Sequence, residues 1–204
     1  MPSTIPFSSP CAFPEVPALP GAGRVVLVRV SVPPVRRDAR PRVRAALHTI
    51  LAVWSGLPPS ALPLWEGPRG PVWRGQLGDY PIDISLSYTG AEAWIALLRN
   101  GRIGVDALEI QFLPDVEAVT RLYLGPAALA AIRPAADPHR AFALAWTEME
   151  ARLKCSKRDL TEWSPTQSSQ ASLCSCQHYF PAEPLVVAVA TCPIMDEHVI
   201  GLAG

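Results

Sequence analysis

The sequence predicts an α+β protein of two similar halves that meet near Asn100. Short β-branched or alternating segments are interspersed with longer segments of helical periodicity, and both kinds occur on each side of Asn100. The length of 204 residues fits one large domain or two halves of about 100 residues each. We therefore divide the chain into an irregular proline-rich arm at 1–23, an N-terminal half at 24–100 and a C-terminal half at 101–204.

The N-terminal half is rich in proline, because 14 of the 23 prolines fall within the first 71 positions. We expect most of that segment to be loop. The β-branched run 24–30 predicts a buried strand, and apolar residues at helical spacing predict a helix over 38–54. Residues 66–78 are rich in glycine and proline, which predicts a loop.

The middle of the chain has strand signals. Residues 81–87 alternate, with Ile82, Ile84 and Leu86 on one side and polar residues on the other. A buried strand is predicted over 93–99 and a short strand over 102–106. Between them, Asn100-Gly101 is a hairpin turn signal.

The C-terminal half is predicted to carry two helices and one further strand. Apolar periodicity indicates helices over 115–131 and 138–158, and an apolar run indicates a strand over 184–191. The Ser/Gln-rich stretch 164–175 is predicted to be a polar loop.

Composition excludes several classes of protein. Hydrophobic residues make up 49% of the chain, which argues against intrinsic disorder. Eighteen basic and eighteen acidic residues give a net charge of zero, which argues against a nucleic-acid binder. No apolar run reaches the roughly 18–20 residues of a membrane span, and no signal peptide is evident. We expect a cytoplasmic, monomeric protein without membrane or nucleic-acid partners.

The five cysteines are odd in number and scattered, which is typical of a reducing compartment. Cys174, Cys176 and His178 lie close together in sequence and are potential metal ligands. No second pair of ligands with zinc spacing accompanies them, so we do not predict a zinc site here.

The basic residues are distributed unevenly. Sixteen of the eighteen are arginine, and seven of these fall within residues 24–44, where Asp38 is the single acid. Arg37, Arg40 and Arg44 recur at three-to-four spacing, so they share a face of the predicted helix. That face is either an ordinary solvated surface or a site for phosphate, which arginine binds in bidentate geometry.

Two acidic residues of the C-terminal half are candidate metal ligands. On the second predicted helix, Phe142, Trp146, Met149 and Leu153 form one apolar stripe, with Glu150 at its edge. Glu150 is either the partner of Lys154 in an i, i+4 ion pair or part of a site with Asp106. Carboxylates from a strand and a helix edge are ligands that Mg²⁺ takes.

Four short motifs in order resemble the 4′-phosphopantetheinyl transferases of the broad-specificity, pseudo-dimeric type. That family has a run of Gly-Arg/Lys-Pro, Ser-(x)-Ser-His-Ser/Thr, Gly-Val-Asp-x-Glu and Trp-Thr/Ser-x-Lys-Glu-Ala-x-x-Lys. The corresponding segments in this sequence are Arg69-Gly70-Pro71, Ser85-Leu86-Ser87-Tyr88-Thr89-Gly90, Gly104-Val105-Asp106 and Trp146-Thr147-Glu148-Met149-Glu150-Ala151-Arg152-Leu153-Lys154. The order and spacing agree from about residue 36 to residue 163.

The resemblance implies a fold of two α/β halves related by a pseudo-twofold, with coenzyme A and Mg²⁺ bound between them. It also implies transfer of phosphopantetheine from coenzyme A to a serine of an acyl or peptidyl carrier protein, with release of adenosine 3′,5′-bisphosphate. The carriers of this family serve polyketide, peptide or fatty acid synthases.

The matching positions imply roles for individual residues. Asp106 and Glu150 would hold Mg²⁺, with Glu109 as a third ligand, and Glu150 would take the serine proton. Lys154 would neutralise charge that develops on the phosphate. The cofactor-binding residues implied are Arg37, Arg40, Arg69, Ser87, Tyr88 and Thr89.

The sequence departs from the family pattern at three positions. Tyr88 replaces a histidine, Leu108 stands where a second acid is expected, and Met149 stands where lysine is usual. Glu109 is displaced by one residue, and on a regular strand this points its side chain to the opposite face unless a bulge intervenes. These departures favour an alternative, a catalytically weakened relative that binds coenzyme A or a carrier protein without efficient transfer.

Overall fold

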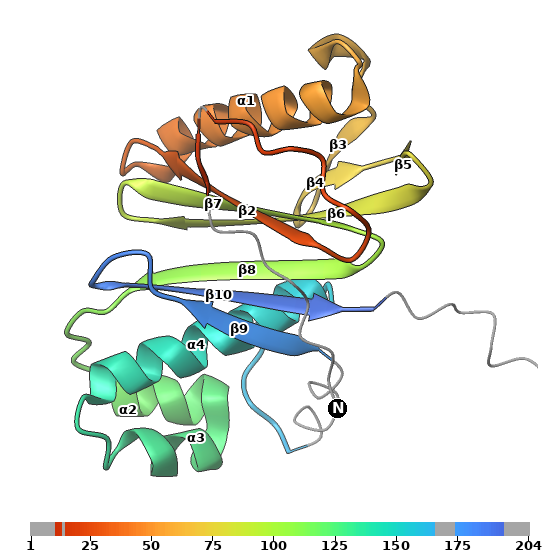
Figure 1. Ribbon diagram of the computed structural model, residues 1–204. Coiled ribbons are helices and arrows are strands. Elements are labelled where there is room, and N and C mark those ends of the chain that lie inside the picture. Colours follow the sequence, from red (N-terminus) through yellow and green to blue (C-terminus); the bar gives the residue numbers. More distant parts are fainter. Residues whose placement is uncertain (1–10, 14, 166–173, 194–204) are drawn as a thin grey trace, which may run out of the picture.

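The computed structural model describes residues 11–13, 15–165 and 174–193. These residues build four successive layers: a helix, a larger sheet, a smaller sheet and a second helix, with a short helical segment beyond (Figure 1). The elements in chain order are β1 (Cys11–Ala12), β2 (Val25–Ser31), α1 (Arg36–Ser55), η1 (Pro59–Ala61), β3 (Leu64–Gly67), β4 (Gly70–Trp73), β5 (Gln76–Leu77), β6 (Tyr80–Thr89), β7 (Glu92–Arg99), β8 (Arg102–Glu109), α2 (Val116–Val119), η2 (Thr120–Leu124), α3 (Gly125–Ile132), α4 (Pro138–Cys155), β9 (Ser175–Tyr179) and β10 (Leu185–Cys192). The α+β class predicted from the sequence is confirmed.

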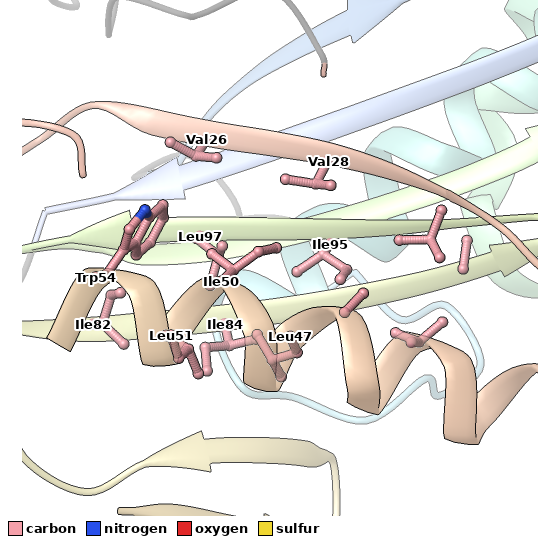
Figure 2. Packing of buried hydrophobic residues seen from close by; sticks show 14 of the residues in the cluster. Val26, Val28, Leu47, Ile50, Leu51, Trp54, Ile82, Ile84, Ile95 and Leu97 are labelled. Carbon is pink, nitrogen blue, oxygen red and sulfur yellow. The ribbon is translucent and has the colours of Figure 1, made fainter. Parts of the chain in front are cut away.

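Helix α1 covers one face of the five-stranded sheet, whose strand order is β1-β2-β7-β6-β5. Its apolar stripe is buried, and Leu47, Ile50 and Leu51 pack on Val28, Ile84 and Ile95 of the strands (Figure 2). Each such side chain contributes about 1.5–3 kcal/mol when fully buried. The helix ends at Gly56, which adopts a left-handed conformation (φ 68°) and donates its N–H to the carbonyl oxygen of Ala52. This layer fixes the orientation of β6.

The other face of this sheet packs on a three-stranded sheet of order β8-β10-β9. The contact is apolar: Leu27 and Trp94 from the larger sheet lie in one buried cluster with Ile103, Val105 and Val187 from the smaller one. Since alternate residues of a strand face opposite ways, the even-numbered residues of β8 point to the far side, toward α4. The strands of the two sheets therefore form the centre of the molecule.

Helix α4 lies directly on the smaller sheet. Its buried stripe consists of small residues at four-residue spacing, with Ala143, Thr147, Ala151 and Cys155 at the sheet. Gly104 of β8 faces this stripe, and a Cβ atom there would overlap the carbonyl oxygen of Ala151 and lie 2.5 Å from the backbone nitrogen of Cys155. Small side chains on both elements thus permit a short helix-to-sheet distance.

The buried face of α4 differs from the prediction. The sequence pattern grouped Phe142, Trp146, Met149 and Leu153 in one apolar stripe, which we expected to be the buried face. Of these four only Phe142 is buried, and Met149 and Leu153 line an apolar cavity. The reason is the close approach at Gly104, which selects small residues for the face that meets the sheet. Larger apolar residues are therefore displaced to the side of the helix.

The two halves of the chain repeat one topology. In the first, β2, α1, β6 and β7 follow in that order, and β7 pairs with both other strands. In the second, β8, α4, β9 and β10 follow in that order, and β10 again lies between the other two. All these pairings are antiparallel. Each half thus contains three antiparallel strands of this order covered by one helix.

The turn at Asn100 joins these halves without making the hairpin that its sequence predicted. Asn100 has a positive φ of 59°, as the turn signal implies. However, β7 and β8 belong to different sheets, so the turn passes the chain from one sheet to the other. Strand β8 also continues to Glu109, beyond the end at Asp106 that the sequence suggested.

Several other boundaries differ from prediction. Residues 66–78 are not simply a loop, because Leu64–Gly67 and Gly70–Trp73 form a hairpin in which apolar side chains oppose one another across the strands. The arm at 1–23 contains the short strand β1, parallel to β2. The helix expected at 115–131 is divided into α2, a π-helical turn and α3. Strand β9 was not predicted, and most of the predicted polar loop 164–175 lies outside the described residues.

The helices of the described residues include none that is both long and apolar enough to span a membrane.

Replacing Gly104 by alanine tests the contact between α4 and β8. We expect Gly104→Ala to lower the free energy of unfolding by about 3 kcal/mol or more, because the added methyl group overlaps helix backbone that cannot move independently. Chemical denaturation measures this change. Gly21→Ala is the control, since its Cβ would lie 3.9 Å from the nearest side-chain atom, and a loss of similar size there would contradict the assignment.

Candidate functional site

A row of polar side chains on β6 joins the two halves. Asp83, Ser85 and Ser87 point away from α1, as the alternation predicted. Each accepts a hydrogen bond from a backbone N–H of β8: Asp83 from Ile103 (2.8 Å), Ser85 from Val105 (3.0 Å) and Ser87 from Ala107 (3.1 Å). Strand β8 is an edge strand of its sheet, so these side chains supply partners for N–H groups that no neighbouring strand serves.

Asp106 lies at the end of this row and is 9% exposed. Its Oδ1 accepts hydrogen bonds from the hydroxyl of Ser87 (3.0 Å) and from Nζ of Lys154 (2.7 Å), and Lys154 also donates to the carbonyl oxygen of Val105 (3.0 Å). A buried carboxylate is stable only when it is paired and hydrogen-bonded. Oδ2 accepts no hydrogen bond from the described part of the chain, so one oxygen of Asp106 is available to a ligand.

Glu150 lies one helical turn before Lys154 on α4 and beside Asp106. Burial raises the pKa of the Glu150 carboxyl, the negative charge of Asp106 raises it further, and the positive charge of Lys154 opposes both effects. Lys154 pairs with Asp106, so the i, i+4 ion pair with Glu150 that the spacing allowed is not formed among the described residues. The site therefore holds two adjacent carboxylates and one ammonium group.

These residues line a cavity of about 480 Å³ between the two halves. Residues of the first half on its wall include Arg36, Arg69, Ser87 and Tyr88, and residues of the second half include the carboxylates and several cations. The cationic and anionic side chains of the lining are Arg36, Arg69, Asp106, Glu150, Lys154, Lys157, Arg158 and Asp159. Five positive groups face three negative ones, so the cavity is suited to an anionic ligand.

Two of the cations hold the walls of the cavity together. Arg69, in the turn between β3 and β4, donates two hydrogen bonds to the carboxylate of Asp159 (2.9 and 2.7 Å). Lys157 lies 2.7 Å from both carboxylate oxygens of Asp83. Both pairs connect the first half to the segment that follows α4 and so fix the width of the cavity.

Tyr88 closes the cavity on the side of α1. Arg36 lies over its ring, with 5.2 Å from the guanidinium carbon to the ring centroid. Burial raises the pKa of the Tyr88 hydroxyl, while the positive charges of Arg44, Arg36 and Arg40 oppose this. Tyr88 is therefore a neutral hydrogen-bonding group close to three arginines.

Six of the predicted site residues line this one cavity, although they come from distant parts of the sequence. They are Arg69, Ser87, Tyr88, Asp106, Glu150 and Lys154.

The other four candidates lie elsewhere. Arg37 is 87% exposed and pairs with Asp38, and Arg40 is exposed beside Tyr88. Thr89 lines a smaller neighbouring cavity. Strand β8 pairs regularly with β10 as far as Glu109, so no bulge turns Glu109 toward the site, and it lies with Thr89 at a separate cavity. Leu108 occupies the cavity wall in its place.

Sequence reasoning missed Arg36, Asp83 and Lys157. A signal for Arg36 was present, because Arg36, Arg40 and Arg44 are spaced by four and share a helix face, whereas Arg37 is turned by about 100° from Arg36. Asp83 belonged to the predicted alternating row but had no evident partner, since its pairing with Lys157 spans 74 positions.

The donor set of the site fits a hard cation. The free oxygen of Asp106 and the carboxylate of Glu150 are oxygen ligands, and Mg²⁺ is typically held by one or two carboxylates together with phosphate oxygens and water. Arginine and lysine side chains around them would bind the phosphates. The arrangement is thus suited to a ligand that contains a polyphosphate.

The hydroxyl of Ser85 is predicted to contribute to the contact between the halves. We expect Ser85→Ala to lower the free energy of unfolding by about 1–3 kcal/mol, because the buried N–H of Val105 loses its acceptor. Chemical denaturation checks this, with exposed Ser31→Ala as the matched control. Equal stability of the Ser85 variant and the wild type would argue against the polar row as the link.

A second prediction concerns the electrostatic coupling of the two carboxylates. Asp106→Asn removes a negative charge that disfavours ionisation of Glu150, so the pKa of Glu150 is expected to fall toward its ordinary value. Titration of the glutamate side-chain carboxyl carbons by NMR measures it. Asp79→Asn, at an exposed position, serves as the control, and an unchanged or higher pKa in the Asp106 variant would refute the coupling.

No known family model matches the chain, and no curated protein matches it either.

Proposed function

We propose that this protein is a 4′-phosphopantetheinyl transferase. It transfers phosphopantetheine from coenzyme A to a serine of an apo acyl or peptidyl carrier protein, in the presence of Mg²⁺, and releases adenosine 3′,5′-bisphosphate. The observation that carries this proposal is the cavity between the halves, where Asp106, Glu150 and Lys154 meet Arg36 and Arg69.

The repeated topology supports the same proposal. Each half contains strand, helix, strand and strand, with the last strand in the middle of its sheet. We propose that the halves are related by a pseudo-twofold, as the resemblance to this family implies, with the ligand between them. Both halves contribute charged groups to the cavity, which is consistent with a ligand that spans the interface.

Coenzyme A is bound in this proposal chiefly through its phosphates. Arg36 and Arg69 lie on the wall contributed by the first half, while Lys154, Lys157 and Arg158 lie on the wall contributed by the second. Charge-assisted hydrogen bonds to phosphate are about twice as strong as neutral ones. Exposed arginines of α1 beyond the cavity extend the positive surface, which complements an acidic carrier protein.

The reaction requires a base for the serine hydroxyl and compensation of charge on the phosphate. As the serine oxygen forms its bond to the β-phosphorus, the bond from that phosphorus to the adenosine bisphosphate oxygen breaks, and the serine proton passes to Glu150 or to a water that Glu150 orients. The raised pKa of Glu150 brings this base closer to the working pH. Lys154, held at Asp106, supplies positive charge next to the pyrophosphate.

Asp106 and Glu150 are the residues that would hold Mg²⁺. When bound, the cation acts as a Lewis acid that neutralises the pyrophosphate charge. Ser87 orients Asp106 through its hydroxyl and is itself fixed by the N–H of Ala107, so the position of the carboxylate depends on the contact between the halves.

Incubation with coenzyme A, Mg²⁺ and a panel of apo carrier proteins tests the activity, with mass spectrometry to detect the added phosphopantetheine. We expect at least one carrier to gain it. Failure with every carrier, under conditions in which coenzyme A binds, would overturn the transferase proposal.

The base role of Glu150 is tested by Glu150→Gln. The transfer rate is expected to fall by about 10²- to 10⁴-fold, since a glutamine cannot accept the proton. Coenzyme A binding, measured by calorimetry, shows whether the variant retains its cavity. Glu148→Gln on the same helix is the matched control because Glu148 pairs with Arg152 outside this cavity, and an equal loss of rate in both variants would exclude the specific role.

The structure predicts different contributions of the neighbouring Arg36 and Arg37 to coenzyme A binding. Arg36→Gln is expected to weaken coenzyme A binding about tenfold, equivalent to about 1.4 kcal/mol, through loss of one charge at the cavity. Arg37→Gln should leave the affinity within about twofold, because that side chain points into solvent. Calorimetry compares the two, and a larger effect at Arg37 would contradict the assigned wall of the site.

A binding protein without efficient transfer is the second candidate, and Leu108 favours it. This apolar side chain occupies the cavity wall where the family pattern has a second acid, so the proposed Mg²⁺ ligands at this cavity are two carboxylates, Asp106 and Glu150, rather than three. Binding of coenzyme A that does not depend on Mg²⁺ or on Asp106 would support this candidate, whereas a metal requirement would support the transferase.

A further inference from the structure

Four of the five cysteines lie at the C-terminal end of α4, where Cys155 directly follows Lys154, and at the parts of β9 and β10 that pack against it. Cys155 is the last residue of α4, Cys174 immediately precedes β9, and Cys192 ends β10. The sulfur atoms of these three lie within 4.8 Å of one another. They come from three separate elements, although they are distant in sequence, and together they form a compact cluster of sulfur atoms.

The pairing of β9 with β10 explains why these side chains meet. Cys176 lies opposite Ala190, and continuation of that register places Cys174 opposite Cys192, with 4.6 Å between their Cα atoms. Residues two apart on a strand share a face, so all three cysteines face α4. Cys176 packs against the same buried cluster as Cys155.

The cluster is buried but has a route of access. Cys155 is fully buried and donates its thiol hydrogen to the carbonyl oxygen of Arg102 (3.3 Å), and Cys174 is 6% exposed. Cys174 also lines the apolar cavity of about 540 Å³ beside Met149 and Leu153. A small ion can therefore approach the cluster through this cavity at Cys174.

The donor chemistry distinguishes this cluster from the carboxylate site. Thiolate sulfur prefers Zn²⁺ or Cu⁺, whereas Mg²⁺ takes oxygen ligands. Tetrahedral Zn²⁺ with bonds of about 2.3 Å requires sulfur atoms roughly 3.8 Å apart. The sulfur atoms of the three cysteines lie within 4.8 Å of one another, which is compatible with that spacing. Cys174 and Cys192 form a disulfide in the structure, so this bond must first be reduced to two thiols.

We propose that Cys155, Cys174 and Cys192 form a site for one Zn²⁺ ion in the reduced protein, with Cys176 as the candidate fourth ligand. The site forms when a dithiol or phosphine reductant supplies two electrons, two protons are taken up and the sulfur–sulfur bond breaks to give two thiols. Binding of the ion then releases the protons of the coordinating thiols to solvent. The ion ties the end of α4 to β9 and β10, and it stabilises the helix that carries Glu150 and Lys154.

Burial raises the pKa values of the Cys155 and Cys176 thiols to about 12, which opposes their ionisation, so the bound ion must displace their protons. The proposal rests on the closeness of the sulfur atoms and not on these pKa values. This inference does not depend on the transferase proposal, since it concerns other residues and a different class of ion.

The test uses the full chain, which is first reduced with a phosphine. The reductant is then removed under anaerobic conditions, and the protein is titrated with Zn²⁺ in competition with a chromophoric chelator. We expect one Zn²⁺ per chain, and Co²⁺ in its place should give a sulfur-to-cobalt charge-transfer band. Cys155→Ser should weaken binding by at least about 100-fold, since loss of a ligand exceeds the roughly 10- to 100-fold effect of losing a supporting contact. Cys11→Ser, at the cysteine that is not among the proposed ligands, should leave affinity unchanged.

Alkylation of the wild-type protein decides the matter if the Cys155 variant does not fold. With Zn²⁺ bound, peptides containing Cys155, Cys174 and Cys192 should be protected from alkylation, and Mg²⁺ should give no protection. Absence of Zn²⁺ binding by the reduced chain, a cobalt complex without the charge-transfer band, or unchanged affinity in a folded Cys155→Ser variant would each overturn the proposal. A disulfide that resists reduction while the protein stays folded would also overturn it.

Discussion

Hydrogen bonds between the side chains of β6 and the backbone of β8 are the constraint on which the site depends. They connect two sheets that share no strand ladder in the described residues, and they do so with three side chains at alternate positions. Because Ser87 also binds Asp106, the connection between the sheets positions a carboxylate at the same time. Packing between the sheets is apolar and adaptable, whereas this polar row allows a single register.

The second constraint is the short distance between α4 and β8. Gly104 and the small stripe on α4 bring the helix backbone close to the strand, so Lys154 reaches both Asp106 and the carbonyl oxygen of Val105. The same geometry leaves Met149 and Leu153 beside the sheet rather than on it. One glycine therefore determines both which residues of α4 are buried and how close its charged residues come to β8.

Local patterns in the sequence were sufficient for the main elements and for half of the site. The alternation over 81–87 correctly separated the polar row from the apolar one, and helical spacing located α1 and α4. Periodicity alone gave the wrong buried face for α4, because it selects the face with the most hydrophobic side chains. It contains no information on the close approach at Gly104, where only small side chains fit between helix and strand. It also could not reveal that Asn100 leads into a different sheet, since turn chemistry is the same in both cases.

Long-range pairings account for what else was missed. Nothing near Asp83 in sequence indicates Lys157, and nothing near Cys155 indicates Cys174 or Cys192, since each contact arises from the stacking of layers. Arg36 was distinguishable from Arg37 only by the choice of helix face. The hairpin at 64–73 was hidden because its glycines and prolines are typical of loops, although its apolar residues oppose one another across the strands.

The chain passes from one half to the other through Asn100 and Gly101, so the cavity is formed between two modules, the N-terminal half and the C-terminal half. Arg36 and Arg69 belong to one module, and Asp106 and Glu150 belong to the other. A rigid-body shift of one module against the other would alter the spacing of opposite charges without deforming either sheet. Ligand affinity therefore depends on how the two modules are placed relative to each other. A substitution far from the cavity that weakens the contact between the modules changes this affinity, although every lining residue is retained.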